Sequence, residues 1–248
     1  MESLGSVVKA AVLAGLIAGA GVAGFHALLI EPVLDRAIAL EEHLSQARGE
    51  AAHEPPIDRR TQRWGMVLGF LLYGAIWGLL LGVAFYLTRT WHPPAWTTTR
   101  RGLLFALLAG WSVAMFPFLK YPANPPGVGD PQTIGYRQML YFGFMGLSVG
   151  GTALAVGLSR LLRRAPWSSA LAGGGGVLAF GFYVLYAVAL YVTMPANPDP
   201  VAMPAQLVWA FRAISFTGLV VFWMALGGIF GWFAREASPR LWQRRESW

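Results

Sequence analysis

Six long runs of apolar residues constrain this chain more than any other feature of its sequence. They cover roughly residues 10–30, 65–87, 102–119, 139–158, 170–192 and 213–234. A helix of about 20 apolar residues crosses the hydrocarbon core of a bilayer and satisfies its own backbone hydrogen bonds there. Only 12% of the 248 residues are charged, about half the fraction found in soluble domains. We therefore predict an all-α, multi-pass membrane protein with six transmembrane helices, forming a single membrane domain over residues 1–248.

The charges between these runs predict how the helices are oriented. Six spans place both termini on one side of the membrane, and the helices then form three hairpins whose loops face the other side. The side with the termini carries eleven Lys and Arg residues and three acids, whereas the loop side carries eight and nine. Segments rich in Lys and Arg stay in the cytoplasm. We therefore expect cytoplasmic termini and loops that face outward.

The first outer loop, residues 31–64, is acidic. Glu31-Pro32 suits the start of a helix, and apolar residues recur behind it at helical spacing. We expect a short amphipathic helix at the membrane surface, followed by a mobile loop over residues 48–58. Seven of the twelve carboxylates lie between Glu31 and Asp58. Such a surface raises the local concentration of cations.

The other two outer loops, residues 120–137 and 194–212, are rich in proline and share the tetrapeptide Pro-Ala-Asn-Pro. Proline lacks an amide donor and restricts the residue before it, so we expect loops of fixed shape. The residues expected to build them are Lys120, Asn124, Arg137, Asn197 and Arg212. Arg137 and Arg212 would pair with Asp130 and Asp199, or reach toward lipid headgroups as the alternative. The shared tetrapeptide could also be a coincidence between two turns.

Histidines and carboxylates on the outer side are the candidate metal ligands, because imidazole and carboxylate side chains bind divalent metal ions. The candidates are His26, Glu31, Asp35, Glu41, Glu42, His43, His53, Asp130 and Asp199. An ionisable group inside a span, such as His26, is a functional candidate by default. A solvated acidic helix and an interfacial histidine are the alternatives, since no close-spaced ligand motif is present.

Several classes of function are not expected. The chain has no cysteine, which removes thiolate metal sites and thiol catalysis. We find no phosphate-binding loop, Ser/His/Asp set or paired catalytic carboxylates, so we expect neither enzymatic activity nor a bound cofactor. Basic residues gather at span ends rather than in one patch, so nucleic acid is not an expected partner. Glycines four residues apart predict close helix contacts, and they are Gly15/Gly19, Gly74/Gly78/Gly82, Gly146/Gly150 and Gly227/Gly231.

Three stretches of the chain resemble CbtA, the probable cobalt transporter subunit family. They run from Glu31 to Glu42 (Glu-Pro-Val-Leu-Asp-Arg-Ala-Ile-Ala-Leu-Glu-Glu), from Phe118 to Arg137 around Lys-Tyr-Pro-Ala-Asn-Pro-Pro-Gly-Val-Gly-Asp-Pro, and from Met203 to Arg212. The resemblance implies a membrane subunit of a divalent metal uptake system in the cytoplasmic membrane of a prokaryote. It also implies Co²⁺ or Ni²⁺ as cargo, surrounding lipids, and a small CbtB-like partner or other membrane proteins. Family members often carry a His-rich first loop, which here keeps only His43 and His53.

The alternative is a structural or assembly subunit of a larger membrane complex, without a transport path of its own. Glycine ladders and the scarcity of charges inside the spans fit this function too. A transport path needs polar side chains that converge at mid-membrane, and the sequence offers Ser112, Ser148, Thr152, Ser215 and Thr217. Copurification would separate the two hypotheses, because a stable multi-subunit complex favours the structural role.

Overall fold

The computed structural model describes residues 3–47, 49, 57–92, 95–126, 128–164, 169–201 and 203–236. Within these ranges the chain is mostly helical and contains no strand. Six helical segments are long and apolar enough to cross a membrane. They are Leu4–His43, Arg59–Leu87, Thr98–Lys120, Pro131–Arg163, Gly174–Thr193 and Ala205–Arg235. The prediction of an all-α, multi-pass membrane protein is therefore confirmed.

The chain divides into two compact units. Unit 1 comprises Met1–Gly110, Pro125–Gly127 and Pro204–Trp248, and unit 2 comprises Trp111–Asn124 and Val128–Met203. Our expectation of a single domain did not include this division. Its first boundary, between Gly110 and Trp111, falls inside an apolar run that carries no sign of a linker.

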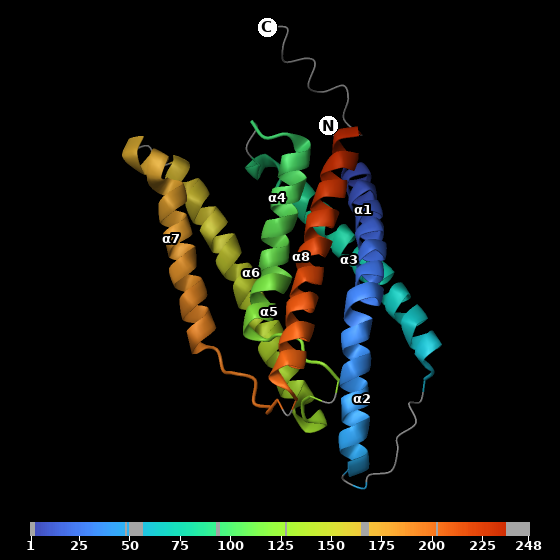
Figure 1. Ribbon diagram of the computed structural model, residues 1–248. Helices are drawn as coiled ribbons and strands as arrows, with labels where there is room; N and C mark the ends of the chain where they lie inside the picture. Colours follow the sequence, from blue (N-terminus) through green and yellow to red (C-terminus); the bar gives the residue numbers. More distant parts are fainter. Residues whose placement is uncertain are drawn as a thin grey trace. The chain divides into compact units, whose positions relative to one another are not determined.

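Unit 1 consists of five α-helices with close contacts between them (Figure 1). They are α1 (Leu4–Phe25), α2 (Glu31–Ala47), α3 (Arg59–Leu87), α4 (Thr98–Gly110) and α8 (Ala205–Glu236), with the short helix η2 (Arg89–Trp91) between α3 and α4. α1 packs on α3 and α8, and α4 packs on α8. A Cβ atom added to Gly15 would overlap the carbonyl of Gly74, and one on Gly227 would lie 2.6 Å from the Cβ of Ala106. These glycines therefore let the helix backbones touch.

The first helix does not stop where the sequence predicts. The π-helical turn η1 (His26–Ile30) joins α1 to α2, so one helix runs from Leu4 to Ala47. Its 44 residues extend about 66 Å at 1.5 Å per residue, roughly twice the thickness of the hydrocarbon core. We expected a separate helix lying on the membrane surface, but α2 extends the axis of α1 (Figure 1).

Two π-helical turns explain why helices continue past prolines that would normally end them. A proline ring clashes with the carbonyl four residues earlier and leaves that carbonyl without its usual N–H partner. The turn η1 ends two residues before Pro32, and a second π-helical turn, η3 (Trp111–Met115), ends two residues before Pro117. In η1 the N–H of Glu31 donates to the carbonyl of His26, five residues earlier. The wider turn makes room for the proline ring without ending the helix.

Unit 2 is built around an antiparallel pair of long helices (Figure 1). Its elements are η3, α5 (Phe116–Lys120), η4 (Pro131–Thr133), α6 (Ile134–Arg164) and α7 (Ser169–Thr193). Phe116, Phe144 and Leu190 form its buried core. Tyr186 on α7 donates to the carbonyl of Leu147 on α6 at 2.9 Å.

Not every predicted glycine contact is used in the described structure. A Cβ atom on Gly151, in α6, would overlap the ring of Tyr186, which shows how closely the two helices approach there. The predicted pair Gly146 and Gly150 has no described atom within 4 Å of its Cβ positions. That pair therefore makes no close helix contact within the described chain.

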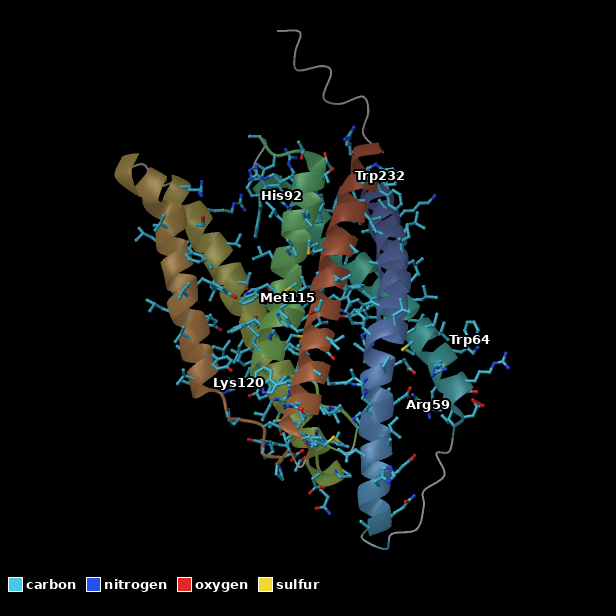
Figure 2. All side chains as sticks on the ribbon, viewed as in Figure 1. Arg59, Trp64, His92, Met115, Lys120 and Trp232 are labelled. Atoms are coloured by element: carbon cyan, nitrogen blue, oxygen red, sulfur yellow. The ribbon has the colours of Figure 1, made fainter. Side chains whose placement is uncertain are left out.

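Two exposed tryptophans lie at different levels along unit 1 (Figure 2). Trp64, near the start of α3, is 66% exposed, and Trp232, near the end of α8, is 52% exposed. Tryptophan prefers the two membrane–water interfaces, so these positions fit helices that cross a bilayer. The start of α1 meets the end of α3, since Gly82 lies against Val8. The arrangement of all six spans as three hairpins stays a prediction.

Candidate functional site

Asp199 holds the two Pro-rich loops of unit 2 together. Its side chain is only 3% exposed, and its carboxylate lies 3.0 Å from Nε of Arg137. The hydroxyl of Thr133 donates to it at 2.8 Å. The backbone N–H of Asp130 donates to it at 3.1 Å. A buried carboxylate with charged and neutral donors on several sides acts as a structural anchor.

Each Pro-rich loop also stabilises its own turn. Oδ1 of Asn197 accepts a hydrogen bond from the N–H of Asp199 at 3.1 Å. Oδ1 of Asp130 accepts one from the N–H of Gln132 at 2.8 Å, where η4 leads into α6. Both are turns in which a short side chain replaces a backbone acceptor. The asparagine and the aspartate therefore shape the loops that carry them.

The arginine pairs differ in part from the expected ones. Arg137 forms its ion pair with Asp199, and its Nη2 donates to the backbone carbonyl of Asp130 at 3.2 Å. Gly129 makes this geometry possible, because its φ is +110° and a Cβ atom there would lie 2.6 Å from Nη1 of Arg137. Arg212 belongs to α8 in unit 1. Its pairing with an acid of the loops stays a prediction.

A second set of contacts fastens the end of α5 to the end of α7. Nζ of Lys120 donates to the carbonyl of Tyr191 at 2.8 Å. The hydroxyl of Tyr121 donates to the carbonyl of Pro195 at 2.7 Å. Burial, with a smaller contribution from Tyr136, raises the pKa of this hydroxyl, so it keeps the proton that it donates.

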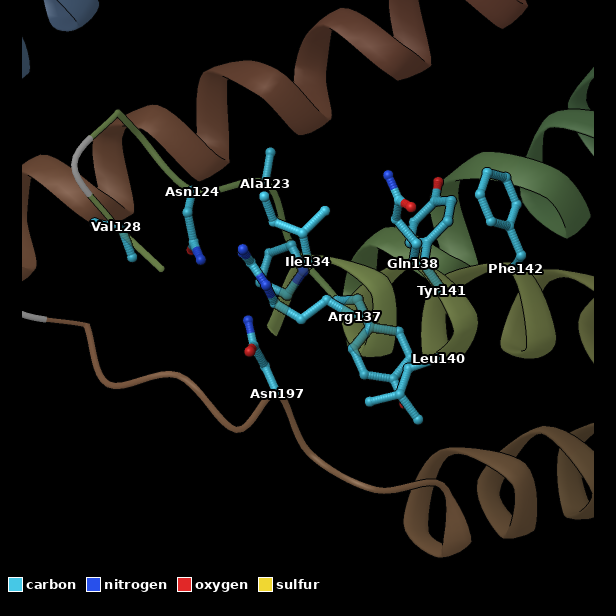
Figure 3. A pocket seen from close by; sticks show the side chains of 12 residues that line it. Ala123, Asn124, Val128, Ile134, Arg137, Gln138, Leu140, Tyr141, Phe142 and Asn197 are labelled. Carbon is cyan, nitrogen blue, oxygen red and sulfur yellow. The ribbon is translucent and has the colours of Figure 1, made fainter. Parts of the chain in front are cut away.

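These contacts frame a pocket of about 410 Å³ in unit 2. Asn124, Arg137 and Asn197 extend toward one another around it (Figure 3). The two asparagines are the third residues of the two Pro-Ala-Asn-Pro segments. The structure thus brings together, at one pocket, three of the five residues predicted to build the loops.

An ion-pair cluster lies where α2 approaches the start of α3 in unit 1. The carboxylate of Glu31, with its side chain 11% exposed, is 3.3 Å from Nη2 of Arg59 and 3.1 Å from Nε of Arg63. Asp35 also pairs with Arg59. Two acids and two arginines leave the cluster without net charge. The guanidinium groups contact one oxygen of each carboxylate and compensate the charge that would attract a cation.

The remaining metal candidates are spread over the chain. Glu41, Glu42 and His43 lie in the last turns of α2, and the latter two are exposed. His26 packs its ring 4.4 Å from that of Phe70. His53 lies outside the described residues. No group of three or more His, Cys, Asp or Glu side chains within the described residues could share one metal ion.

Sequence reasoning missed the partners of several site residues. Arg59 and Arg63 stand four residues apart, as do Glu31 and Asp35. This matched spacing is typical of two helices whose faces pair, and it could have predicted the cluster. Thr133 gave no such signal, because its contact with Asp199 depends on how two distant loops meet.

Comparisons with known proteins bear on the whole chain. The sequence model of one family, described as "Probable cobalt transporter subunit (CbtA)", matches residues 4–235. That range includes all six candidate spans and the pocket residues. Neither the comparison with curated proteins nor that with solved structures finds a match.

Proposed function

The chain belongs to the CbtA family of probable cobalt transporter subunits, and from this premise we propose that it is a membrane subunit of a divalent metal uptake system. The observation that carries the proposal is the family match over residues 4–235 of a chain with six candidate membrane spans. A family of transporter subunits is not a class of enzymes. No described contact favours the alternative of a purely structural subunit.

We assign the first encounter with the cation to the far end of α2. Glu31 and Asp35 are paired with arginines, so their charge is compensated. No ion pair involving Glu41 or Glu42 occurs among the described residues, and His43 beside them is exposed. Carboxylate and imidazole groups on a projecting helix attract divalent cations weakly and without fixed geometry.

The cargo, orientation and partner are parts of the same proposal. Co²⁺ is the expected ion and Ni²⁺ the closest competitor, since both accept imidazole and carboxylate ligands. The excess of Lys and Arg near the termini supports cytoplasmic ends in a prokaryotic cytoplasmic membrane. A small CbtB-like membrane subunit is the partner that we expect, with lipid around the spans.

The test is cobalt accumulation in cells that produce the full chain. Glu41→Gln combined with Glu42→Gln should lower the initial rate of Co²⁺ uptake about two- to fivefold, because it removes two charges from the capture segment. The effect should shrink in high salt, since the Debye length is about 10 Å at 0.1 M. Glu236→Gln, an acid on the predicted cytoplasmic side, is the matched control and should leave uptake unchanged.

Orientation is tested in the same cells. A cysteine at Glu42, in a chain without other cysteines, should react with an impermeant thiol reagent from outside. Protection of this cysteine in intact cells would contradict the orientation. Unchanged uptake by the double glutamine variant, at normal amounts in the membrane, would contradict the capture role.

A further inference from the structure

We propose that the pocket framed by the two Pro-rich loops of unit 2 binds a phosphate-bearing anionic ligand. This site is separate from the metal-capture segment and has the opposite preference of charge. The proposal stands on the volume of the pocket, the polar groups that line it, and its apolar wall. None of these observations depends on the cobalt function.

Several side chains with hydrogen-bond donors line the polar side of the pocket, and Arg137 is the charged one. Nε of Arg137 lies 3.0 Å from the carboxylate of Asp199, and its Nη2 donates to the carbonyl of Asp130, so both contacts hold the guanidinium group beside the cavity. Asn197 uses Oδ1 for a backbone N–H, so its amide nitrogen remains as a donor. A guanidinium group with amide donors around it is the kind of arrangement that recognises phosphate oxygens.

Two further lining residues add hydrogen-bond donors that have no described partner within the protein. The amide of Gln138 and the hydroxyl of Tyr141 line the pocket (Figure 3), and neither has a hydrogen bond among the described residues. Both lie on α6, within two turns of its start at Ile134. Their hydrogen-bonding capacity is therefore available to a ligand.

The same lining disfavours a metal ion. No carboxylate of the described part of the chain lines the pocket, while the positively charged Arg137 does. The carboxylate of Asp199 lies 3.0 Å from Nε of Arg137, and its side chain is only 3% exposed, so its oxygens are not offered to a ligand in the pocket. A divalent cation would meet a guanidinium group, amides and tyrosine hydroxyls but no lining carboxylate among the described residues, whereas an anion gains charge-assisted hydrogen bonds from the guanidinium group.

The remaining wall suggests what the phosphate is attached to. Ile134, Leu140 and Phe142 line the pocket, and Phe142 is 60% exposed on a membrane-spanning helix. A volume of about 410 Å³ lies in the range of small-molecule sites, at roughly 300–1,000 Å³. A phospholipid, with its phosphate at the donors and its chains along the apolar wall, meets both requirements. A soluble phosphate would use the donors alone.

The experiment measures ligand binding by the purified full-length protein in detergent. Phosphatidylglycerol, phosphatidylcholine and inorganic phosphate are titrated separately, and the rise in unfolding temperature reports binding. The test variant combines Gln138→Leu with Tyr141→Phe, which removes two donors and leaves the contacts of Asp199 in place. Gln132→Leu combined with Tyr136→Phe makes the same chemical changes on exposed neighbours outside the pocket and is the matched control.

We expect the test variant to bind about tenfold more weakly, since two hydrogen bonds to the ligand are lost. The control should bind like the parent, and all three proteins should unfold alike without ligand. Preference for phosphatidylglycerol identifies a lipid as the source, and saturation by inorganic phosphate identifies a soluble ligand. Equal binding by parent, test and control would overturn the proposal, as would stabilisation by Co²⁺ through these residues. Loss of cobalt uptake in the α2 variants bears on neither result.

Discussion

Replacing Asp199 tests whether the loops of unit 2 are held by a structural anchor or by a metal ligand. Asp199→Ala removes the ion pair with Arg137 and the bonds from Thr133 and the N–H of Asp130. Breaking a buried pair by removing one partner costs about 3–5 kcal/mol. Arg137 is 26% exposed and can turn toward water, so we expect the lower end, about 3 kcal/mol.

The magnitude converts into a measurable shift. For a chain of this size, a loss of 1 kcal/mol in the free energy of unfolding lowers the unfolding temperature by about 2–4 °C. The unfolding temperature of Asp199→Ala should therefore be about 6–12 °C lower than that of the parent. Asp199→Asn keeps the shape of the side chain and one of its acceptor oxygens, and it should lower the free energy of unfolding by about 1–2 kcal/mol. Thermal unfolding of the purified protein in detergent, followed by tryptophan fluorescence, gives both values. Asp130→Ala, which removes only an exposed turn contact, should cost about 1 kcal/mol and is the control.

A double-mutant cycle isolates the ion pair. If Asp199 acts mainly through Arg137, the double variant Asp199→Ala with Arg137→Gln should lose much less stability than the sum of the two single losses. Unfolding of Asp199→Ala within about 1 °C of the parent would refute the anchor. A variant that keeps its stability but loses cobalt binding would instead make Asp199 a metal ligand.

Two further predictions concern unit 1. Gly74→Ala should strongly lower the yield of folded protein in the membrane, because its Cβ would overlap the carbonyl of Gly15. Gly69→Ala is the control and should leave the yield unchanged, because there is open space at that position. Equal yields of the two variants would contradict the described packing of α1 on α3. Burial, together with the nearby charge of Arg101, lowers the pKa of His92 to about 4. The unfolded chain, with an ordinary pKa of about 6.5, then binds more protons between these values, so stability is complete above pH 6.5 and falls toward pH 4. His92→Gln should flatten this dependence of unfolding temperature on pH, and an unchanged slope would show that other groups cause it.

The spans were predictable because their cause is local. About 20 apolar residues suffice for a membrane helix whatever surrounds them, and each predicted run lies mainly within an observed helix. The ends were not predictable to the same degree. α8 begins at Ala205 rather than near residue 213, because Arg212 interrupts the apolar run without ending the helix, and the N–H groups of Leu207 and Val208 already donate to the carbonyl of Pro204.

The predicted break at Pro32 failed for a physical reason. Proline usually starts or ends a helix, but the π-helical turn before it lets the helix pass. Contacts between residues far apart in the sequence could not be predicted from it either. The role of Asp199 depends on Thr133 and Arg137, which stand 66 and 62 residues before it in the sequence, and no short-range pattern encodes that meeting.

The unbroken helix from Leu4 to Ala47 has a mechanical consequence. A rod of about 66 Å that tilts by about 5° at one end moves its other end by about 6 Å. The first span is one end of this rod, and the acidic residues Glu41 and Glu42 are near the other. Rocking of the first span would therefore be amplified at Glu41 and Glu42, the proposed capture residues, and the turn at His26–Ile30 would decide how much of that movement is transmitted.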